Sequence, residues 1–311
     1  MSALAFLFPG QGSQSAGMGH ALYSSYEEAR IVFDQADEVL GFKLSTLCFE
    51  GPEEELKKTE NTQPALLTVS VAACRVLEQR GYKPDFVAGH SLGEYSALVA
   101  AGSLKFSDAV RLVKQRGRFM QQAVPPGVGA MAALLKLPEE KLDSILRQAS
   151  AGGEIVAAAN FNSPDQIVIA GHAAAVDRAM ALAKEAGARK AVQLPVSAPF
   201  HCPLMKPAQE QMKPELNDTE FRDLRTPLTN NWQAAEIRTG SDARNGLFEQ
   251  IPNPVRWTES VRELAGKGVT KFVEVGAGAV LSGLCRSIDP NLKGAKFGDP
   301  SDLEKVQMLL G

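Results

Sequence analysis

The sequence predicts an α/β protein, in which a large domain with a mainly parallel sheet carries a small inserted α+β domain. Three observations indicate this class. Short apolar runs alternate with helical patterns at both ends of the chain, the order of elements changes in the middle, and 44% of the 311 residues are hydrophobic. A chain of this length is enough for about two domains and needs neither disulfides nor a metal for stability.

The N-terminal part of the chain predicts βα units. Apolar runs over 4–8 and 86–88 have the length of buried strands, and between them lie a polar–apolar stretch over 26–48 and a helical pattern over 65–79. Strands that are separated by helices usually pair in parallel. We therefore expect a mainly parallel sheet.

Between residues 127 and 195 the elements follow another order. The pattern predicts strand, helix, strand, strand, helix and strand at 129–137, 138–149, 155–159, 166–170, 173–186 and 190–194. This order is the ferredoxin-like unit. We expect a small ferredoxin-like domain at 127–195, inserted into a large α/β domain formed by 1–126 and 196–311, where a strand over 272–275 and a helix over 279–288 resume the first pattern.

The composition excludes several classes of protein. Lys and Arg number 33 against 36 Asp and Glu, which gives no reason to expect nucleic acid as a partner. The four cysteines include no C-x-x-C pair, and no ligand cluster predicts a metal, so we expect a reducing cytoplasm. No Lys or Arg precedes Arg30, which argues against a signal peptide, and the longest apolar stretch, 128–135, is too short to span a membrane.

The strongest local motif is the pentapeptide Gly89-His90-Ser91-Leu92-Gly93. An apolar run precedes it and a helical pattern follows it, which is the strand–turn–helix context of a nucleophile elbow. The flanking glycines permit a sharp turn that lifts the Ser91 hydroxyl to a helix N-terminus, where backbone N–H groups stabilise negative charge. The alternative is a serine that only caps the helix.

A serine nucleophile needs a base, and the chain has four histidines. His90 adjoins the serine, where neighbouring side chains diverge; His172 falls at a turn of the small domain, and His20 follows the first glycine-rich loop. His201 lies in a proline-rich segment over 194–203, at the return of the chain to the large domain. Since prolines restrict the backbone, this segment can hold an imidazole in place. Elimination favours His201 as the base.

Arg116 is a charge on the apolar face of a predicted helix. The apolar stripe of that helix comprises Ala109, Leu112, Val113, Met120 and Ala123. A buried guanidinium keeps its charge and needs an anion. On pattern alone an internal Asp or Glu is the favoured partner, and a substrate carboxylate is the alternative.

The first glycine-rich loop, over 10–19, is not a phosphate-binding loop. Met18 stands where such a loop requires Lys, and the spacing of the glycines does not fit a dinucleotide fingerprint. Its exposed backbone amides could instead contribute to an oxyanion hole.

Taken together, the motifs resemble those of the malonyl-CoA:acyl-carrier-protein transacylases of type II fatty acid synthesis. In chain order they are Phe8-Pro9-Gly10-Gln11-Gly12-Ser13-Gln14, GHSLGEYSAL at 89–98, Gln115-Arg116-Gly117, Asn160-Phe161-Asn162-Ser163-Pro164, Pro199-Phe200-His201, Gln250 with Pro254-Val255-Arg256-Trp257, and Glu274-Val275-Gly276. They cover nearly the whole chain.

The resemblance implies an α/β-hydrolase-like large domain and a malonyl transfer that passes through an acyl-serine. The malonyl group would move from coenzyme A, a substrate and not a cofactor, to the phosphopantetheine thiol of an acyl carrier protein. The implied roles are nucleophile for Ser91, base for His201, malonyl carboxylate ligand for Arg116, oxyanion-hole amides for Gln11 and Leu92, and a main-chain carbonyl near Gln250 that orients the imidazole.

Two other activities stay open at this point: a serine esterase or thioesterase with the same elbow, and an acyltransferase of a polyketide pathway. An acidic carrier protein calls for a basic surface, for which Lys184, Arg189, Lys190 and Arg286 are candidates. We expect a monomer.

Overall fold

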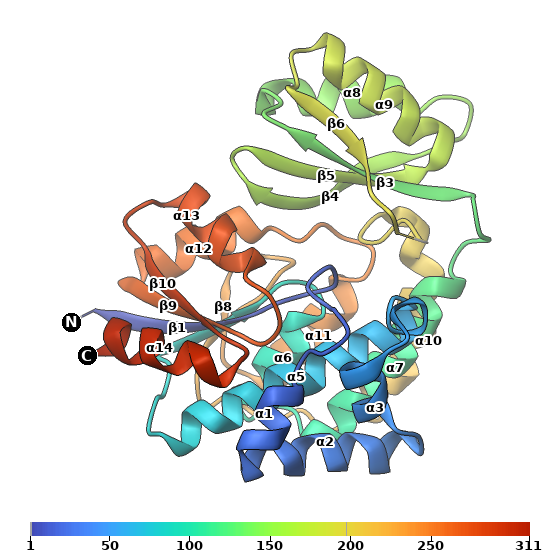
Figure 1. Ribbon diagram of the computed structural model, residues 1–311. Coiled ribbons are helices and arrows are strands. Elements are labelled where there is room, and N and C mark those ends of the chain that lie inside the picture. The colour runs from blue at the N-terminus through green and yellow to red at the C-terminus, as the bar shows by residue number, and fades with distance from the viewer. Residues whose placement is uncertain (1, 197) are drawn as a thin grey trace.

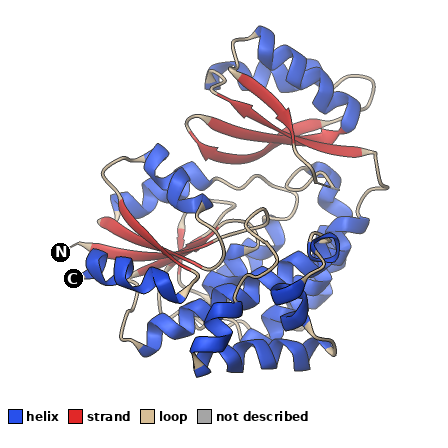
Figure 2. Cartoon of the chain, in the orientation of Figure 1, coloured by secondary structure: helices blue, strands red, loops and turns tan. Residues whose placement is uncertain are grey.

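The computed structural model describes residues 2–196 and 198–311. Met1 and Ser197, which fall in the predicted large domain, lie outside the described residues. The described chain forms a six-stranded and a four-stranded sheet, each with helices packed on it (Figures 1 and 2). Both ends of the chain lie on the same side of the larger part, near β1 and α14 (Figure 1).

The larger sheet has the strand order β10-β9-β1-β2-β7-β8. Its strands are β1 (Ala3–Phe8), β2 (Phe86–Gly89), β7 (Leu228–Thr229), β8 (Glu236–Ile237), β9 (Val269–Val275) and β10 (Lys293–Phe297). All neighbours pair in parallel except β8, which runs antiparallel to β7 at the edge. The mainly parallel sheet predicted from the βα pattern is confirmed.

Helices cover both faces of this sheet, and β1 shows why its sequence is continuously apolar. Phe6 and Phe8 point into the core beneath α5, while Ala5 and Leu7 point into a second core beneath α12 and α13. A strand that is buried on both faces has no polar alternation.

The helices of this part are α1 (His20–Ser25), α2 (Glu27–Leu40), α3 (Leu44–Glu50), α4 (Glu53–Leu56), α5 (Thr59–Gln79), α6 (Gly93–Ala100), α7 (Phe106–Gln122), α10 (Lys206–Asn217), α11 (Gly240–Glu249), α12 (Trp257–Gly266), α13 (Val280–Ile288) and α14 (Leu303–Leu310).

The polar–apolar stretch over 26–48 forms two helices. Helix α2 ends at Gly41, whose φ of 72° is left-handed, and α3 begins three residues later, at Leu44. A glycine adopts this conformation without strain, so it terminates the helix and turns the chain.

The smaller sheet has the order β4-β5-β3-β6 and is antiparallel throughout. Its elements are β3 (Gly129–Leu135), α8 (Leu142–Ala149), β4 (Val156–Ser163), β5 (Gln166–His172), α9 (Ala173–Glu185) and β6 (Lys190–Gln193). The predicted ferredoxin-like order of elements is confirmed, and α8 and α9 pack on one face of the sheet (Figure 1).

The other face of the smaller sheet packs on the core of the larger part. Met131 and Ala159 belong to that core, whereas Ile169 belongs to the separate core under α8 and α9. Strand β4 is also tied to the segment before α12, since Phe161 N–H donates to the Val255 carbonyl at 2.9 Å and Val255 N–H donates to the Ala159 carbonyl at 2.9 Å. The smaller sheet therefore lies over one end of the larger one.

Candidate active site

Ser91 sits on a strained turn between β2 and α6. Its φ is +52°, a left-handed value that non-glycine residues rarely adopt. A Cβ on Gly89 would lie 2.0 Å from the backbone of Gly93, and a Cβ on Gly93 would lie 2.0 Å from the Phe8 carbonyl oxygen. Only glycine fits at these two positions, so the strand–turn–helix geometry predicted from the pentapeptide is present.

Ser91 and His201 are in hydrogen-bond contact across 110 residues of sequence. The Ser91 Oγ to His201 Nε2 distance is 2.7 Å, and His201 Nδ1 lies 2.8 Å from the backbone carbonyl of Gln250. A carbonyl only accepts, so Nδ1 carries the proton and Nε2 is free to accept from the serine hydroxyl. The group that accepts the hydrogen bond of His201 Nδ1–H is thus a backbone carbonyl and not an acidic side chain.

His201 is held neutral. Burial lowers its pKa to about 3, and the nearby Arg116 charge acts in the same direction, while the Gln250 carbonyl opposes them. A neutral imidazole next to a hydroxyl can accept a proton at neutral pH.

None of the other three histidines has a hydrogen bond to Ser91 Oγ in the described part of the chain, although His90 also lines the pocket. His90 Nε2 lies 2.8 Å from Asn162 Oδ1. His172 Nδ1 accepts from Ile155 N–H within the smaller sheet, and the His20 ring packs against Phe49.

Arg116 points inward and reaches the nucleophile. Only 1% of the residue is exposed. Its Nη1 donates to Gln63 Oε1 at 2.9 Å, and its Nη2 donates to Gln250 Oε1 at 2.7 Å and to Ser91 Oγ at 3.1 Å. No ion pair joins Arg116 to a carboxylate within residues 2–196 and 198–311. A direct internal Asp or Glu partner, which the helix pattern favoured, is therefore wrong, because the amide oxygens of Gln63, in α5, and Gln250, at the end of α11, take its place. The buried Glu94 carboxylate acts on the guanidinium only at longer range.

Asn231 and Glu94 support the elbow from behind. Asn231 Oδ1 accepts from Ser91 N–H and its Nδ2 donates to the Gly89 carbonyl, both at 2.6 Å, while its own N–H donates to Glu94 Oε2 at 2.9 Å. Burial raises the pKa of Glu94 to about 7. Sequence reasoning missed both residues. Glu94 had the signal that identified Arg116, a charge in an otherwise apolar helix, whereas Asn231 lies in a loop with no periodic pattern.

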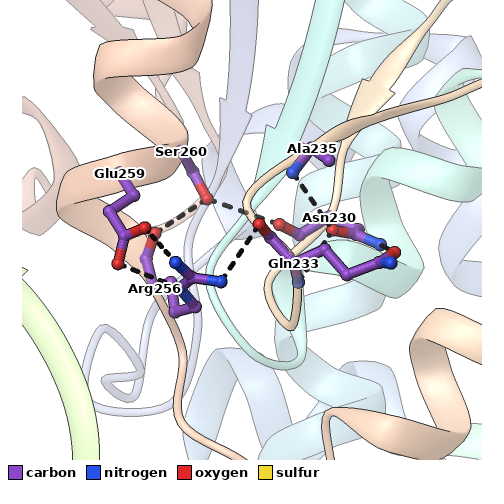
Figure 3. A network of polar contacts seen from close by, with 6 residues as sticks. All are labelled: Asn230, Gln233, Ala235, Arg256, Glu259 and Ser260. Atoms are coloured by element: carbon purple, nitrogen blue, oxygen red, sulfur yellow. Dashed lines mark hydrogen bonds and ion pairs between the residues drawn. The ribbon is translucent and has the colours of Figure 1, made fainter.

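A second layer of contacts fixes the loop that presents Asn231 (Figure 3). Asn230 Oδ1 accepts from Gln233 N–H at 3.1 Å, and Arg256 donates to the Gln233 carbonyl at 3.3 Å while it pairs with Glu259. Ser260 Oγ contacts the Asn230 carbonyl at 3.4 Å. The start of α12 thus holds the loop from one side.

Gln11 and Leu92 line the same pocket as Ser91 and His201. A Cβ on Gly10 would lie 2.4 Å from the His90 carbonyl oxygen, so the first loop runs directly beside the elbow. Among the described residues, the backbone N–H groups of Gln11 and Leu92 have no hydrogen-bond partner. Two free amides beside a nucleophile are what an oxyanion hole requires.

The rest of the pocket is mainly apolar and combines residues of the larger part with residues of the smaller sheet. Its other lining residues are Gln63, His90, Met120, Met131, Asn160, Leu194, Val196 and Phe200. Across the described part of the chain, no group of three or more His, Cys, Asp or Glu residues could hold a metal ion, and no helix is long and apolar enough to cross a bilayer.

Comparison with known proteins agrees with this geometry. Residues 5–289 match the family model described as an acyl transferase domain, so the chain is an acyltransferase. It is 50% identical over 304 residues to the malonyl CoA-acyl carrier protein transacylase of Bacillus subtilis strain 168, which covers 98% of this chain and 96% of that relative. The chain belongs to the family of malonyl CoA-acyl carrier protein transacylases.

Two solved structures show the same fold over nearly the whole chain. An acyl carrier protein S-malonyltransferase from Vibrio cholerae has a TM-score of 0.95 at 46% identity, with 98% of this chain and 100% of that chain covered. A malonyl-transacylase solved in complex with its type II polyketide acyl-carrier protein has a TM-score of 0.95 at 44% identity, with 99% of both chains covered.

Proposed function

We propose that this chain transfers the malonyl group of malonyl-CoA to the phosphopantetheine thiol of an acyl carrier protein, through a malonyl ester on Ser91. Ser91 Oγ attacks the thioester carbon while His201 Nε2 takes its proton, and coenzyme A leaves as a thiolate that recovers this proton. The carrier thiol then gives its proton to His201 and attacks the ester. Ser91 leaves with that proton, and the free enzyme is restored.

The backbone amides of Gln11 and Leu92 would bind the oxyanion of each tetrahedral intermediate. The support for this is their place in the pocket and their lack of other partners within the described residues. Removing one donor of an oxyanion hole typically costs about 10²–10³ in rate.

The contact between Arg116 Nη2 and Ser91 Oγ, at 3.1 Å, is the single observation that carries the malonyl assignment. The hydrogen-bond partners of this buried guanidinium are only amide and hydroxyl oxygens, so a carboxylate in the pocket would supply the direct anionic partner that it lacks. A malonyl group bound to Ser91 ends in a carboxylate, and because the group is short this carboxylate lies close to the Arg116 guanidinium. An acetyl group has none.

Intact-mass measurement after incubation with malonyl-CoA tests the proposal. We expect a malonyl adduct on Ser91 that persists without a carrier protein and disappears when holo carrier protein is added, with no adduct on Ser91→Ala. Rapid release of free malonate without a carrier would instead identify a hydrolase and overturn the proposal.

Arg116→Ala tests the role of the guanidinium separately. We expect the preference for malonyl-CoA over acetyl-CoA to collapse while transfer of uncharged acyl groups persists, since sites built around a polar group reject analogues that lack its partner by up to about 10⁴–10⁵. An unchanged ratio of the two rates would remove Arg116 from the assignment.

Docking of the carrier protein is proposed for a basic surface. Lys184, Arg189, Lys190 and Arg286 are all exposed. Charge reversal at these positions is expected to raise KM for the carrier protein but not for malonyl-CoA. The domain boundaries at 126/127 and 195/196, a monomeric state and a cytoplasmic location stay predictions.

A further inference from the structure

We propose that Glu94 is a positioning residue for acyl-group selectivity: its carboxylate orients the Gln250 side chain, and Gln250 in turn aims Arg116 at the acyl pocket. The inference rests on the proposed function, because it concerns how the carboxylate of the acyl group is recognised. The three side chains come from different elements, α6, the end of α11 and α7. Glu94 and Gln250 are 0% exposed and Arg116 is 1% exposed.

The first step is the orientation of the Gln250 amide. A guanidinium only donates hydrogen bonds, so the Gln250 atom that lies 2.7 Å from Arg116 Nη2 must be the oxygen Oε1. The NH₂ group of the same amide then points away from Arg116. It needs an acceptor there, because a buried unpaired donor is costly.

The acceptor is Glu94. Gln250 Nε2 donates to Glu94 Oε2 at 3.0 Å, and the second nearby acceptor, the Ser91 carbonyl, is more distant at 3.4 Å. Rotating the amide by half a turn would place NH₂ against the guanidinium and oxygen against the carboxylate, which are two repulsive contacts. Glu94 therefore excludes the wrong orientation of Gln250.

Glu94 contacts Arg116 only through Gln250, although its charge also acts on the guanidinium at longer range. No hydrogen bond or ion pair joins Glu94 to Arg116 among the described residues. Of the two carboxylate oxygens, Oε2 accepts both from Gln250 and from Asn231 N–H, whereas Oε1 has no partner in the part of the chain that the structure describes. The orienting function needs one accepting oxygen in the right place and does not need the negative charge.

Two substitutions of Glu94 distinguish the need for an accepting oxygen from the need for a negative charge. Glu94→Gln keeps an accepting oxygen at the Oε2 position and can place its NH₂ at the unpartnered Oε1 position. Glu94→Ala removes the acceptor altogether and frees the Gln250 amide. Ser96→Ala is the matched control, because Ser96 lies on the same helix, is 1% exposed and has a hydroxyl with no partner in the described chain.

The test measures kcat/KM of the full-length variants with malonyl-CoA and with acetyl-CoA, and compares the ratio. For Glu94→Ala we expect the malonyl-to-acetyl ratio to fall by about 10- to 100-fold, the range that corresponds to loss of a hydrogen bond to a charged group. Glu94→Gln should restore the ratio to within a few-fold of the wild type, and Ser96→Ala should leave it unchanged. General damage to the elbow lowers both rates and cancels in the ratio.

Gln250→Leu provides a second route if Glu94→Ala does not fold. It removes the amide but keeps the backbone carbonyl that binds His201, so the same loss of selectivity is expected, and adding Glu94→Ala should cause little further loss. A ratio within about twofold of the wild type in both Glu94→Ala and Gln250→Leu would overturn the inference. So would a Glu94→Gln ratio as low as that of Glu94→Ala. If the wild type forms no malonyl adduct, the proposed function fails first, independently of these ratios.

Discussion

At the scale of single residues, the site depends on one cation placed next to one neutral base. Arg116 contacts the hydroxyl that His201 also contacts, at 3.1 and 2.7 Å. The positive charge disfavours protonation of the imidazole, and burial disfavours it further. In the proposed function the same side chain has two tasks: it binds the anionic acyl group and it keeps the base deprotonated.

The contact of Arg116 with the site of the base predicts that acylation of Ser91 stays fast to an unusually low pH; the pH at which the rate falls is the acid limit of the reaction. Because the pKa of His201 is lowered from 6.5 to about 3, the rate of Ser91 acylation should stay nearly constant from pH 7 to about pH 5, where an ordinary histidine would already be protonated. Single-turnover mass measurements of the malonyl adduct across this range would check it.

The control is Arg116→Ala with acetyl-CoA as the acyl donor. Removing the neighbouring charge should raise the His201 pKa and move the acid limit to higher pH. An acid limit near pH 6.5 in the wild type would contradict the prediction.

At the scale of elements, the elbow is a contact between three backbones. Gly89 and Gly93 bring β2, the start of α6 and the end of β1 together at distances that exclude a Cβ. Gly93→Ala should lower the free energy of unfolding by about 1–3 kcal/mol or more, because the clash is with the rigid Phe8 carbonyl and not with a flexible side chain. Urea denaturation would measure this loss.

Gly283→Ala is the control for that experiment. Gly283 lies inside α13, and nothing stands within 4 Å of the Cβ that alanine would add. Alanine is the better helix former, so this variant should gain about 0.5–1 kcal/mol. A loss of stability of equal size in both variants would contradict the steric explanation.

The loop between β7 and β8 supplies the second support of the elbow. Asn231→Ala removes the acceptor of Ser91 N–H and the donor to the Gly89 carbonyl, so we expect kcat to fall more than KM changes, and a loss of about 1–3 kcal/mol of stability. Arg256→Ala removes only a partly exposed ion pair and one long contact to the loop (Figure 3), so its cost should stay below about 1 kcal/mol. Steady-state kinetics and denaturation of both variants would test this difference.

At the scale of the whole molecule, the pocket is shared between the larger part and the smaller sheet, which has a partly separate core. Ser91 comes from the larger part, whereas Met131 and Asn160 come from the smaller sheet. Ile169 is 0% exposed in the core under α8 and α9, on the face of the smaller sheet that does not line the pocket.

Ile169→Ala should therefore lower the free energy of unfolding by about 2–5 kcal/mol. The variant should lose transfer activity at a lower urea concentration than the wild type, although Ile169 touches no catalytic group. Val192, which is 47% exposed on β6, is the control. Val192→Ala should change stability by less than about 0.5 kcal/mol. Equal losses in the two variants would show that the separate core does not support the site.

The order of elements, the elbow and the inward direction of Arg116 could be predicted from local patterns. Glycine spacing limits the backbone within a few residues, and helical periodicity decides which face of α7 is buried. His201 could be identified only because the chain has four histidines and three were poorly placed.

The partners of these residues were decided by tertiary structure alone. Arg116 meets Gln63 and Gln250 across 53 and 134 residues of sequence, and Ser91 meets Asn231 across 140. Periodicity shows that a side chain points inward, but it carries no information about which distant residue that side chain contacts in the folded protein. That choice depends on how the helices and loops pack around the sheet, which explains why an acidic partner was expected for Arg116 and two amides were found.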